Sequence, residues 1–219
     1  MEKATLLATR FVTHDVKQFI FSKPSGFDYA PGQATHLALD MEGWRDSERP
    51  FTPTSLNADN ILEFTIKAYP SHDGVTKRLH SMKPGDQLLV SDVFGTIIFD
   101  RPGYFIAGGA GITPFIAIMR DLKQKDKLEG NSLLFSNKTE RDIILHEELL
   151  GLFGEDVVFT LTDQKSERYA HGRIDMDFLE KHVTDFTKAF YICGPPTFVK
   201  DISAALEELG ADPSNLVFD

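Results

Sequence analysis

The sequence predicts two domains, an N-terminal antiparallel β-barrel and a C-terminal α/β domain with a mostly parallel sheet. Three observations lead to this fold class. The chain has 219 residues, which is long for one domain and enough for two small ones. Its first half reads as short strands between turns, whereas strands and helices alternate in the second half. The pattern changes at Asp100-Arg101-Pro102-Gly103, so we expect domains of residues 1–101 and 102–219.

Five short strands are expected in the first half. They are rich in Phe, Thr, Val, Ile and Leu, and turn residues such as Pro24-Ser25-Gly26 and Pro84-Gly85 separate them. The segments are residues 4–12, 18–23, 34–40, 62–69 and 87–93. A short helix is expected at residues 75–82. Strands at this spacing favour an antiparallel barrel or sandwich.

Alternating strands and helices are expected in the second half. Residues 104–107 form a compact apolar strand, and apolar side chains recur at helical spacing in residues 114–128. Further strands are expected at residues 132–135, 157–161 and 190–193, and helices at residues 145–153, 176–182 and 197–209. Residues 216–218 read as a final strand. This alternation is typical of a parallel sheet with crossover helices.

Composition narrows the possible functions. With 33 acidic and 23 basic residues the net charge is -10, which argues against binding to nucleic acid phosphates. Cys193 is the single cysteine, so a disulfide within the chain and a four-thiolate iron–sulfur cluster are both excluded. The seven histidines are scattered, and we expect no metal site. No apolar run approaches the ~20 residues of a membrane span. We therefore expect a cytoplasmic monomer.

A glycine-rich turn follows the first strand of the second half. Gly108-Gly109-Ala110-Gly111 lets backbone N–H groups approach a pyrophosphate, and the helix that follows adds partial positive charge. We expect Thr113 to cap this helix and Pro114 to occupy an early helical position. Glycine-rich turns also occur without a ligand, so this segment alone leaves both interpretations open.

A second turn, Cys193-Gly194-Pro195-Pro196, ends a strand and begins the last long helix. In a parallel sheet the ligand lies beyond the carboxyl ends of the strands, so both turns are expected on one rim. A buried structural cysteine beside a helix start is the alternative interpretation. The first turn reads G-G-A-G-I-T-P and so departs from the G-x-G-x-x-G dehydrogenase fingerprint.

In the first half, Arg49-Pro50-Phe51-Thr52-Pro53 combines groups that suit a phosphorylated aromatic ligand. Arg49 can pair with a phosphate, Phe51 offers a flat face, and Thr52 offers a hydroxyl group. Along a regular strand Thr52 would face away from Phe51 unless the prolines introduce a kink. Gly74-Val75-Thr76 begins the short helix and can present N–H groups to the same phosphate. An edge strand with a surface arginine and a core phenylalanine is the alternative.

These segments, in this order, resemble the ferredoxin–NADP reductase superfamily over nearly the whole chain. Residues 49–53 and 136–143 are most similar to the flavin modules of NADH–cytochrome b reductases and nitrate reductases. The resemblance implies FAD in the barrel and NAD(P)H in a Rossmann-like α/β domain. It places Thr52 near flavin N5 and Cys193 beside the nicotinamide, as the catalytic pair. Phe51 stands where the family usually has tyrosine, so stacking is kept but a phenolic hydrogen bond is lost.

The resemblance implies one set of cofactor-binding residues. They are Arg49, Pro50, Phe51, Thr52, Lys67, Tyr69, Gly74, Val75, Thr76, Gly109, Ala110, Gly111, Thr113, Asp163, Cys193, Gly194, Pro195 and Phe218. Phe218 either covers the flavin as a terminal aromatic lid or only closes the sheet. Asp163 would accept hydrogen bonds from a ribose 2′-OH and favours NADH. Basic and polar loop residues that would favour NADPH instead are Ser136, Lys138, Arg141, Lys165, Arg168 and Arg173.

The predicted reaction is hydride transfer from NAD(P)H to flavin N5, followed by transfer of single electrons to a protein. Flavodoxin or ferredoxin is the expected acceptor, and another one-electron acceptor is also compatible with the motifs. Four residues near the short helix either dock an acidic partner or form a solvated face: Lys77, Arg78, His80 and Lys83. A non-catalytic flavin-binding redox sensor or electron-transfer subunit is the alternative function.

Overall fold

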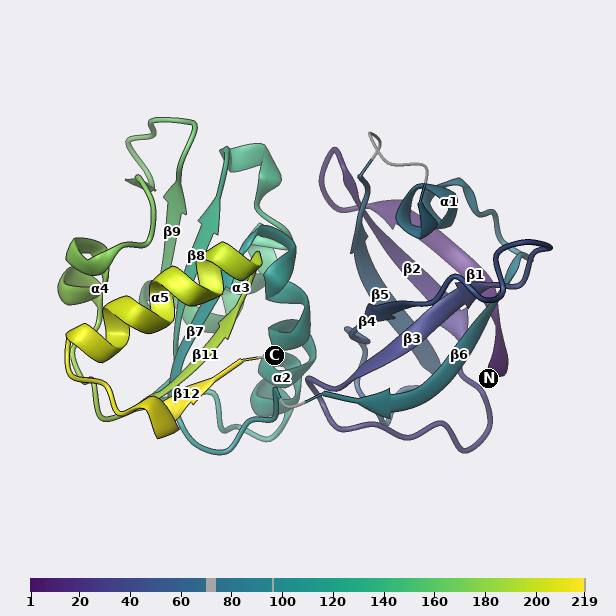
Figure 1. Ribbon diagram of the computed structural model, residues 1–219, viewed down its shortest axis with the longest axis horizontal. Helices are drawn as coiled ribbons and strands as arrows, with labels where there is room; N and C mark the ends of the chain where they lie inside the picture. The colour runs from purple at the N-terminus through teal and green to yellow at the C-terminus, as the bar shows by residue number, and fades with distance from the viewer. Residues whose placement is uncertain (70–73, 96, 219) are drawn as a thin grey trace.

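The computed structural model describes residues 1–69, 74–95 and 97–218. Within them, two six-stranded sheets form two bodies that lie side by side (Figure 1). The N-terminal body is antiparallel throughout, and the C-terminal sheet is parallel throughout. The predicted fold class is therefore confirmed. The predicted boundary falls between β6, which ends at Phe94, and β7, which begins at Gly103.

The barrel sheet has the strand order β4-β3-β6-β1-β2-β5. Its elements are β1 (Glu2–Phe11), β2 (Val16–Ser22), β3 (Ala34–Leu39), β4 (Arg49–Phe51), β5 (Ile61–Lys67), α1 (Val75–Ser81) and β6 (Gln87–Phe94). A bridge between Pro53 and Phe64 connects the segment after β4 to β5, so the two ends of the sheet meet. The alternating strands bury one face on a core that includes Phe19, Phe21 and Phe64.

The second sheet has the strand order β10-β9-β8-β7-β11-β12. Its strands are β7 (Gly103–Gly108), β8 (Ser132–Asn137), β9 (Val157–Leu161), β10 (Ala170–His171), β11 (Ala189–Cys193) and β12 (Leu216–Val217). Its α-helices are α2 (Thr113–Gln124), α3 (His146–Phe153), α4 (Met176–His182) and α5 (Pro196–Glu208). Four 3-10 turns lie between them: Gly109–Ile112, Glu140–Asp142, Gly154–Asp156 and Pro213–Asn215.

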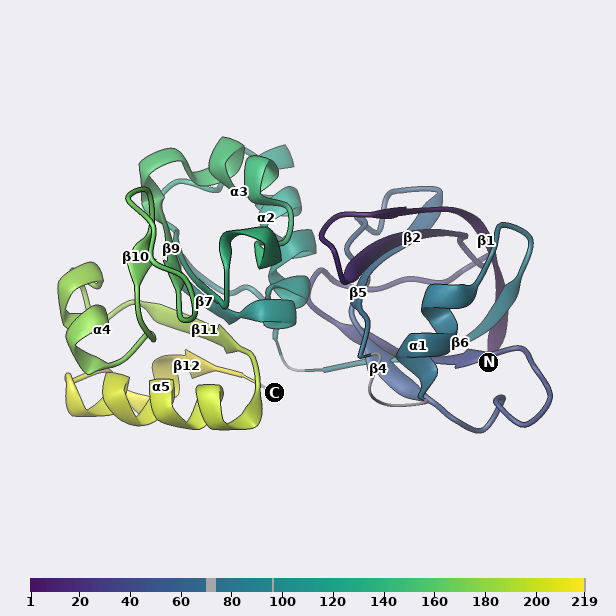
Figure 2. The same ribbon diagram turned by 90° about the horizontal axis from the view of Figure 1, so that it is seen from above.

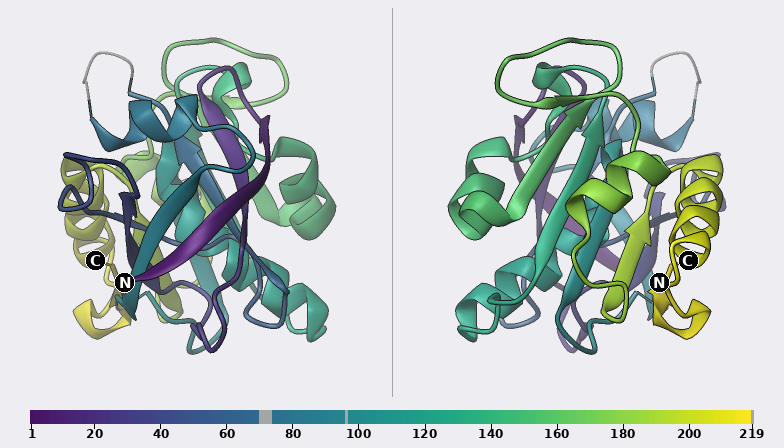
Figure 3. Two further views of the ribbon diagram at one scale, coloured as in Figure 1. Left: turned by 90° about the vertical axis from the view of Figure 1, so that its right-hand side faces the viewer. Right: turned by 90° about the vertical axis from the view of Figure 1, so that its left-hand side faces the viewer.

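Helices cover both faces of this parallel sheet, as Figure 3 shows. Phe115 of α2 and Leu149 of α3 belong to the core on one face. Leu179 of α4 and Leu206 of α5 belong to the core on the other face. Because both faces are covered, the strands are apolar on both sides, and all six residues of β7 are buried.

The two bodies share part of one core. Val16 and Ile97, which precede β7 in the chain, are buried in the same cluster as Phe115. The hydroxyl of Tyr191 in β11 accepts hydrogen bonds from the N–H groups of Asp100 and Arg101, so the connecting segment is attached to the parallel sheet. Seen from above, α2 lies on the side of the α/β domain that faces the barrel (Figure 2).

Two details of the predicted elements are wrong. The helix expected to reach residue 128 ends at Gln124, because Asp126 adopts a positive φ of 54°. Thr113 does not cap α2 but is its first residue, since a 3-10 turn lies between the glycines and the helix. Its hydroxyl donates to the carbonyl of Ala110 at 3.0 Å. The short strand β10 was not predicted, and β4 was predicted only as the edge strand of the alternative interpretation of residues 49–53.

Candidate functional site

The first cavity, here called the barrel pocket, has a volume of about 340 Å³. It lies where the barrel meets the start of α2. Its lining residues are Ala34, Pro50, Phe51, Thr52, Thr65, Ile66, Lys67, Tyr69, Thr76, Phe94, Ala110 and Thr113. Six of the predicted cofactor-binding residues of the barrel are thus brought together with Ala110 and Thr113 from the second domain. The flat ring, the hydroxyls and the apolar walls suit a planar, partly polar ring system.

Strand β4 places the predicted flavin segment at the edge of the barrel sheet. It pairs with β3 through Pro50 opposite His36 and Phe51 opposite Thr35. The strand ends at Phe51, so Thr52 is released from strand alternation, and both side chains line the barrel pocket. Arg49 is exposed at the start of the strand, and its Nη1 donates to the carbonyl of Glu48 at 2.7 Å. It lies beside the barrel pocket without lining it.

The second cavity, here called the rim cavity, has a volume of about 1170 Å³ and opens along the carboxyl ends of the parallel strands. Both predicted turns contribute to it, through Gly108 to Gly111 and through Gly194 and Pro195. Ala107 of β7 is paired with Cys193 of β11, so the two turns leave neighbouring strands at the same level. The prediction that they share one rim is confirmed.

Gly111 is required by close packing of the two turns. A Cβ atom there would lie 2.3 Å from the carbonyl oxygen of Cys193 and 2.7 Å from the Cα of Gly194. Gly109 has a positive φ of 54°, which an L side chain rarely adopts. Bare backbone therefore faces the cavity immediately before α2, in the arrangement that a pyrophosphate needs.

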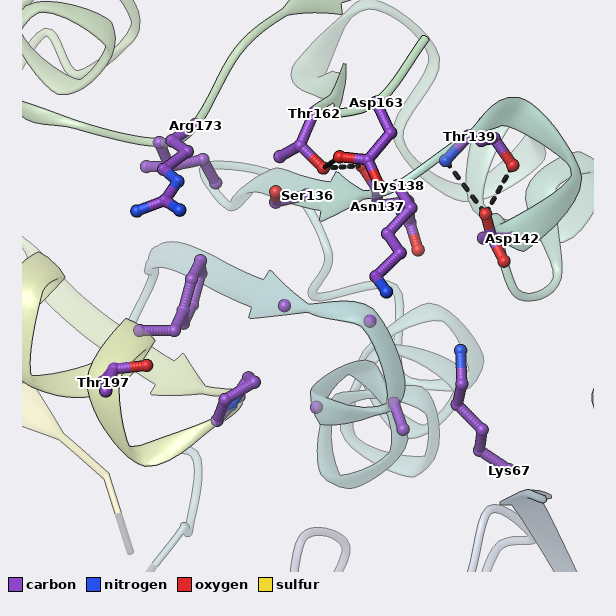
Figure 4. Close-up of a pocket in the computed structure, with 18 of the residues that line it drawn as sticks. Lys67, Ser136, Asn137, Lys138, Thr139, Asp142, Thr162, Asp163, Arg173 and Thr197 are labelled. Atoms are coloured by element: carbon purple, nitrogen blue, oxygen red, sulfur yellow. Dashed lines mark hydrogen bonds between the residues drawn. The ribbon is translucent and has the colours of Figure 1, made fainter. Parts of the chain in front are cut away.

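The outer wall of the rim cavity comes from the ends of β8 and β9, as Figure 4 shows. The Thr162 hydroxyl donates to Oδ1 of Asp163 at 2.9 Å, and the Asp163 N–H donates to the carbonyl of Lys138 at 2.9 Å. Asp163 is thus held beside the cavity, as a ribose-binding carboxylate would be. Of the predicted phosphate-gathering residues, Ser136, Lys138, Arg141 and Arg173 line the cavity.

Lys165 and Arg168 are outside that lining. Arg168 lies over the ring of Tyr169 at 5.4 Å and 3.6 Å from Glu140. It is therefore engaged with residues of the neighbouring loops.

The two cavities share three lining residues, Lys67, Tyr69 and Ala110. Lys67 Nζ lies 3.0 Å from Oδ2 of Asp15, and Figure 4 shows its side chain extending toward the rim cavity. Burial alone would raise the pKa of Asp15, but Lys67, Thr13 and His14 together lower it. A ligand in one cavity thus borders a ligand in the other.

Several predicted residues line neither cavity. Gly74 precedes α1 and Val75 is buried beneath it, although Thr76 lines the barrel pocket. Cys193 packs beside the core that contains α2. Phe218 follows β12 and is 44% exposed. Roles for these residues stay predictions.

The predicted basic surface near α1 is smaller than expected. His80 turns inward, where its Nε2 donates to the carbonyl of Ile66 at 2.8 Å and its ring lies 5.5 Å from that of Phe19. Burial lowers its pKa, and Lys17 lowers it further. Arg78 stacks over Trp44 at 4.6 Å. Packing of this short helix thus turns one of the four predicted cations, His80, away from the docking surface and stacks a second, Arg78, on Trp44.

Sequence reasoning missed the polar contacts between the domains. His14 of the barrel lies 3.7 Å from Asp142, which follows β8, and both line the rim cavity. Asn137 also lines the rim cavity and is 5% exposed. Its side-chain amide has no hydrogen-bond partner within the described residues. The pattern of turns carries no signal for contacts between such distant segments.

Arg120 was missed for the same reason. It extends from α2 to Glu148 of α3 and to Glu63 of β5, so it joins the domains. Burial alone would lower its pKa, but the two carboxylates outweigh burial and raise it. The guanidinium is therefore a fixed positive charge at the interface.

Comparison with known proteins agrees with this geometry. Residues 105–204 match the model of the family described as the oxidoreductase NAD-binding domain. NADH-cytochrome b5 reductase 1 of Arabidopsis thaliana is 31% identical over 92% of this chain and 78% of its own length. The chain belongs to the NADH-cytochrome b5 reductase family. A second relative, NADH-cytochrome b5 reductase 2 of Mycosarcoma maydis, is 32% identical, and the alignment covers 91% of this chain but 63% of that protein.

Solved structures share the fold of this family member over almost its whole length. The CS-b5R domains of human Ncb5or, in an NAD⁺ form, match with a TM-score of 0.84 and 27% identity over 98% of this chain and 68% of that chain. A ferredoxin NADP⁺ reductase from Neisseria gonorrhoeae with bound FAD and NADP has a TM-score of 0.83 at 21% identity, covering 95% and 91%. The predicted superfamily is thus confirmed.

The protein is an NAD(P)H-dependent flavoprotein reductase, and FAD is the flavin bound in the ferredoxin NADP⁺ reductase structure. The cavities described above fit these cofactors, because glycine backbone lines the rim cavity and the barrel pocket offers a flat ring with adjacent hydroxyls. Within the described residues, no helix is both long and apolar enough to cross a membrane.

Proposed function

We propose that this reductase takes a hydride from NADH onto FAD and passes the electrons singly to a small protein. The observation that carries the proposal is the shared wall of the two cavities at Lys67, Tyr69 and Ala110. A flavin ring in the barrel pocket and a nicotinamide in the rim cavity would meet at this wall. FAD, when bound, supplies the chemistry that converts one hydride into two single electrons.

The residues of the barrel pocket bind and orient the flavin in this proposal. Arg49 pairs with an FAD phosphate from the edge of the pocket, and Phe51 stacks against the ring. Thr52 places its hydroxyl near flavin N5, while Thr76 contributes from the start of α1. Because Phe51 has no phenolic hydroxyl, flavin binding loses a hydrogen bond worth on the order of 1 kcal/mol.

The residues of the rim cavity bind the coenzyme. Backbone N–H groups of Gly109, Ala110 and Gly111 hold its pyrophosphate, and Cys193 stands behind the nicotinamide end. Asp163 accepts hydrogen bonds from the ribose 2′-OH and repels a 2′-phosphate, which favours NADH. Lys138 and Arg173 line the same cavity and oppose that preference.

The electron acceptor is a separate part of the proposal. The sequence predicted flavodoxin or ferredoxin, and the names of the relatives favour a cytochrome b5-type heme protein. Since the docking surface near α1 retains fewer cations than expected, the names of the relatives are the stronger argument. We propose the heme protein first and keep flavodoxin and ferredoxin as the alternatives.

Anaerobic titration with NADH and with NADPH tests the proposal. NADH should bleach the flavin. In steady-state assays with an electron acceptor, NADH should give the higher kcat/KM, and Asp163→Ser should reduce that preference. A wild type that prefers NADPH more than tenfold, which is ~1.4 kcal/mol of discrimination, would contradict the role of Asp163. The reduced protein is then mixed with cytochrome b5, flavodoxin and ferredoxin. If neither coenzyme bleaches the flavin, the non-catalytic alternative is the correct one.

A further inference from the structure

Arg120 connects three elements through one guanidinium group. Its Nε and Nη2 donate to the two carboxylate oxygens of Glu148 at 2.5 and 2.9 Å. Its Nη1 donates to the carbonyl of Thr54 at 2.7 Å and to Oε1 of Glu63 at 2.6 Å. Glu148 belongs to the same domain, whereas Thr54 and Glu63 belong to the barrel. The two bonds to Glu148 therefore orient the guanidinium, and the bonds to Thr54 and Glu63 anchor it across the interface.

On the barrel side, this anchor reaches the flavin segment. Thr54 is two residues after Thr52, and its hydroxyl lies 2.7 Å from Glu63 Oε1 and 3.2 Å from the hydroxyl of Thr65, which lines the barrel pocket. Thr54 is fully buried, and its N–H donates to the carbonyl of Glu63 at 2.7 Å. Arg120 thus binds the buried backbone at Thr54, two residues after Thr52 of the proposed flavin site.

On the other side, the anchor lies on the helix that begins at the coenzyme turn. Thr113, the first residue of α2, lines the barrel pocket, and Arg120 is seven residues later on the same helix. Seven residues are two turns, or about 10 Å along the axis, so both residues share one face. Figures 1 and 2 show that α2 runs along the barrel-facing side of its domain.

Because of this geometry, the position of Arg120 controls the distance between the two cofactors. A tilt of about 5° around the Arg120 end would move the Thr113 end, 10 Å away, by about 1 Å. Hydride transfer depends on a separation of about 3–3.5 Å, and a misplacement of about 1 Å costs on the order of a hundredfold in rate. Binding of either cofactor alone is much less sensitive, because each cavity is built mainly within one domain.

We propose that Arg120 is a positioning residue for hydride transfer, which holds the coenzyme turn at a fixed distance from the flavin segment. The inference rests on the flavin reduction proposed above. It predicts a specific division of effects: loss of the anchor slows flavin reduction at saturating coenzyme, while coenzyme affinity and flavin content change little. A purely stabilising ion pair would lower the unfolding temperature without slowing the folded enzyme.

The test uses Arg120→Ala, with Lys125→Ala as the matched control. Lys125 is a cation near the end of the same helix, and its ion pair with Asp121 at 2.7 Å stays within that segment. Anaerobic stopped-flow with NADH gives the limiting reduction rate and the apparent Kd, and thermal unfolding and flavin content are recorded for each variant. Arg120→Ala should reduce the limiting rate at least tenfold with Kd within about threefold, whereas Lys125→Ala should match wild type. Arg120→Lys should recover part of the rate.

A second pair of variants covers the case in which Arg120→Ala does not fold. Glu63→Gln weakens the anchor across the interface, and Glu148→Gln weakens the pair inside the α/β domain. The proposal expects the larger loss of limiting rate in Glu63→Gln. Equal losses in both variants, or a limiting rate in folded Arg120→Ala within twofold of wild type, would overturn it. If wild type itself is not reduced, the proposed function fails; if wild type is reduced and the variants match it, only this inference fails.

Discussion

The two proposed phosphate sites of this reductase are built in opposite ways. In the α/β domain, the turn Gly109–Ile112 lies between the fully buried strand β7 and helix α2, and backbone groups face the ligand. In the barrel, Arg49 stands exposed on the three-residue edge strand β4. The first site is positioned by the core beneath it. The second depends on one long side chain with few fixed contacts.

This difference determines how each site can be damaged. A backbone site has no side chain to delete, but it tolerates no added atom where two turns are packed together. A side-chain site tolerates changes around it, but it loses affinity for the phosphate when the side chain that pairs with the phosphate is removed.

The largest effect is expected from Arg49→Ala, which removes the cation proposed to pair with the FAD phosphate. Loss of a charge-assisted hydrogen bond costs roughly 1.5–3 kcal/mol, so flavin affinity should fall about ten- to a hundredfold. Arg45→Ala is the control, because Arg45 lies in the same connection and pairs with Asp40 at 2.6 Å. Flavin content after gel filtration and the Kd of reconstitution are measured. A retained flavin in Arg49→Ala would remove Arg49 from the site.

A smaller effect on the other site is expected from Gly111→Ala. The added Cβ would lie 2.3 Å from the Cys193 carbonyl oxygen, and such overpacking costs roughly 1–3 kcal/mol. The turn must move, so coenzyme affinity should fall about tenfold while flavin content stays unchanged. Gly151→Ala in α3 is the control, since no atom lies within 4 Å of its Cβ position. Loss of flavin before loss of coenzyme binding would contradict the separation of the two sites.

The same contrast explains what the sequence could predict. The turn between β7 and α2 is local: glycines, an apolar strand and Pro114 lie within a dozen residues, and each has a clear conformational meaning. The strand–helix alternation was local too, so helix α4 was predicted at its observed bounds. Helix α2 was placed correctly but was extended past Asp126, whose left-handed conformation the pattern did not show.

Contacts between distant segments could not be predicted in this way. Arg120 meets Glu63 across 57 residues, and His14 meets Asp142 across the domain interface. No spacing or propensity records such pairs, because they depend on how the two finished domains dock. His80 shows the same limit within the barrel: its place in a basic stretch suggested a surface, but packing on Phe19 turned it inward.

Among the described residues, each domain has one histidine whose pKa is lowered, His80 in the barrel and His182 in the α/β domain. Burial lowers the pKa of both rings. His80 lies on α1, which borders the barrel pocket through Thr76, whereas His182 ends α4 on the far side of the parallel sheet. Protonation of His80 therefore acts close to the proposed flavin site, whereas His182 lines neither cavity.

The smallest effect is expected from pH, through His80. Below about pH 6.5 the unfolded chain binds a proton that the folded ring resists, so stability decreases as the pH falls through the range between the two pKa values. His80→Gln keeps a donor for the Ile66 carbonyl but cannot be protonated, so its unfolding temperature should vary less than that of wild type between pH 7 and pH 5. His182→Gln is the matched control for the other domain. Flavin fluorescence, recorded during the same scans, should show earlier release at pH 5 in wild type than in His80→Gln. Equal pH dependence in wild type and His80→Gln between pH 7 and pH 5 would contradict the role of His80, because stabilisation by carboxylates of lowered pKa, such as Asp15, is lost only at more acidic pH.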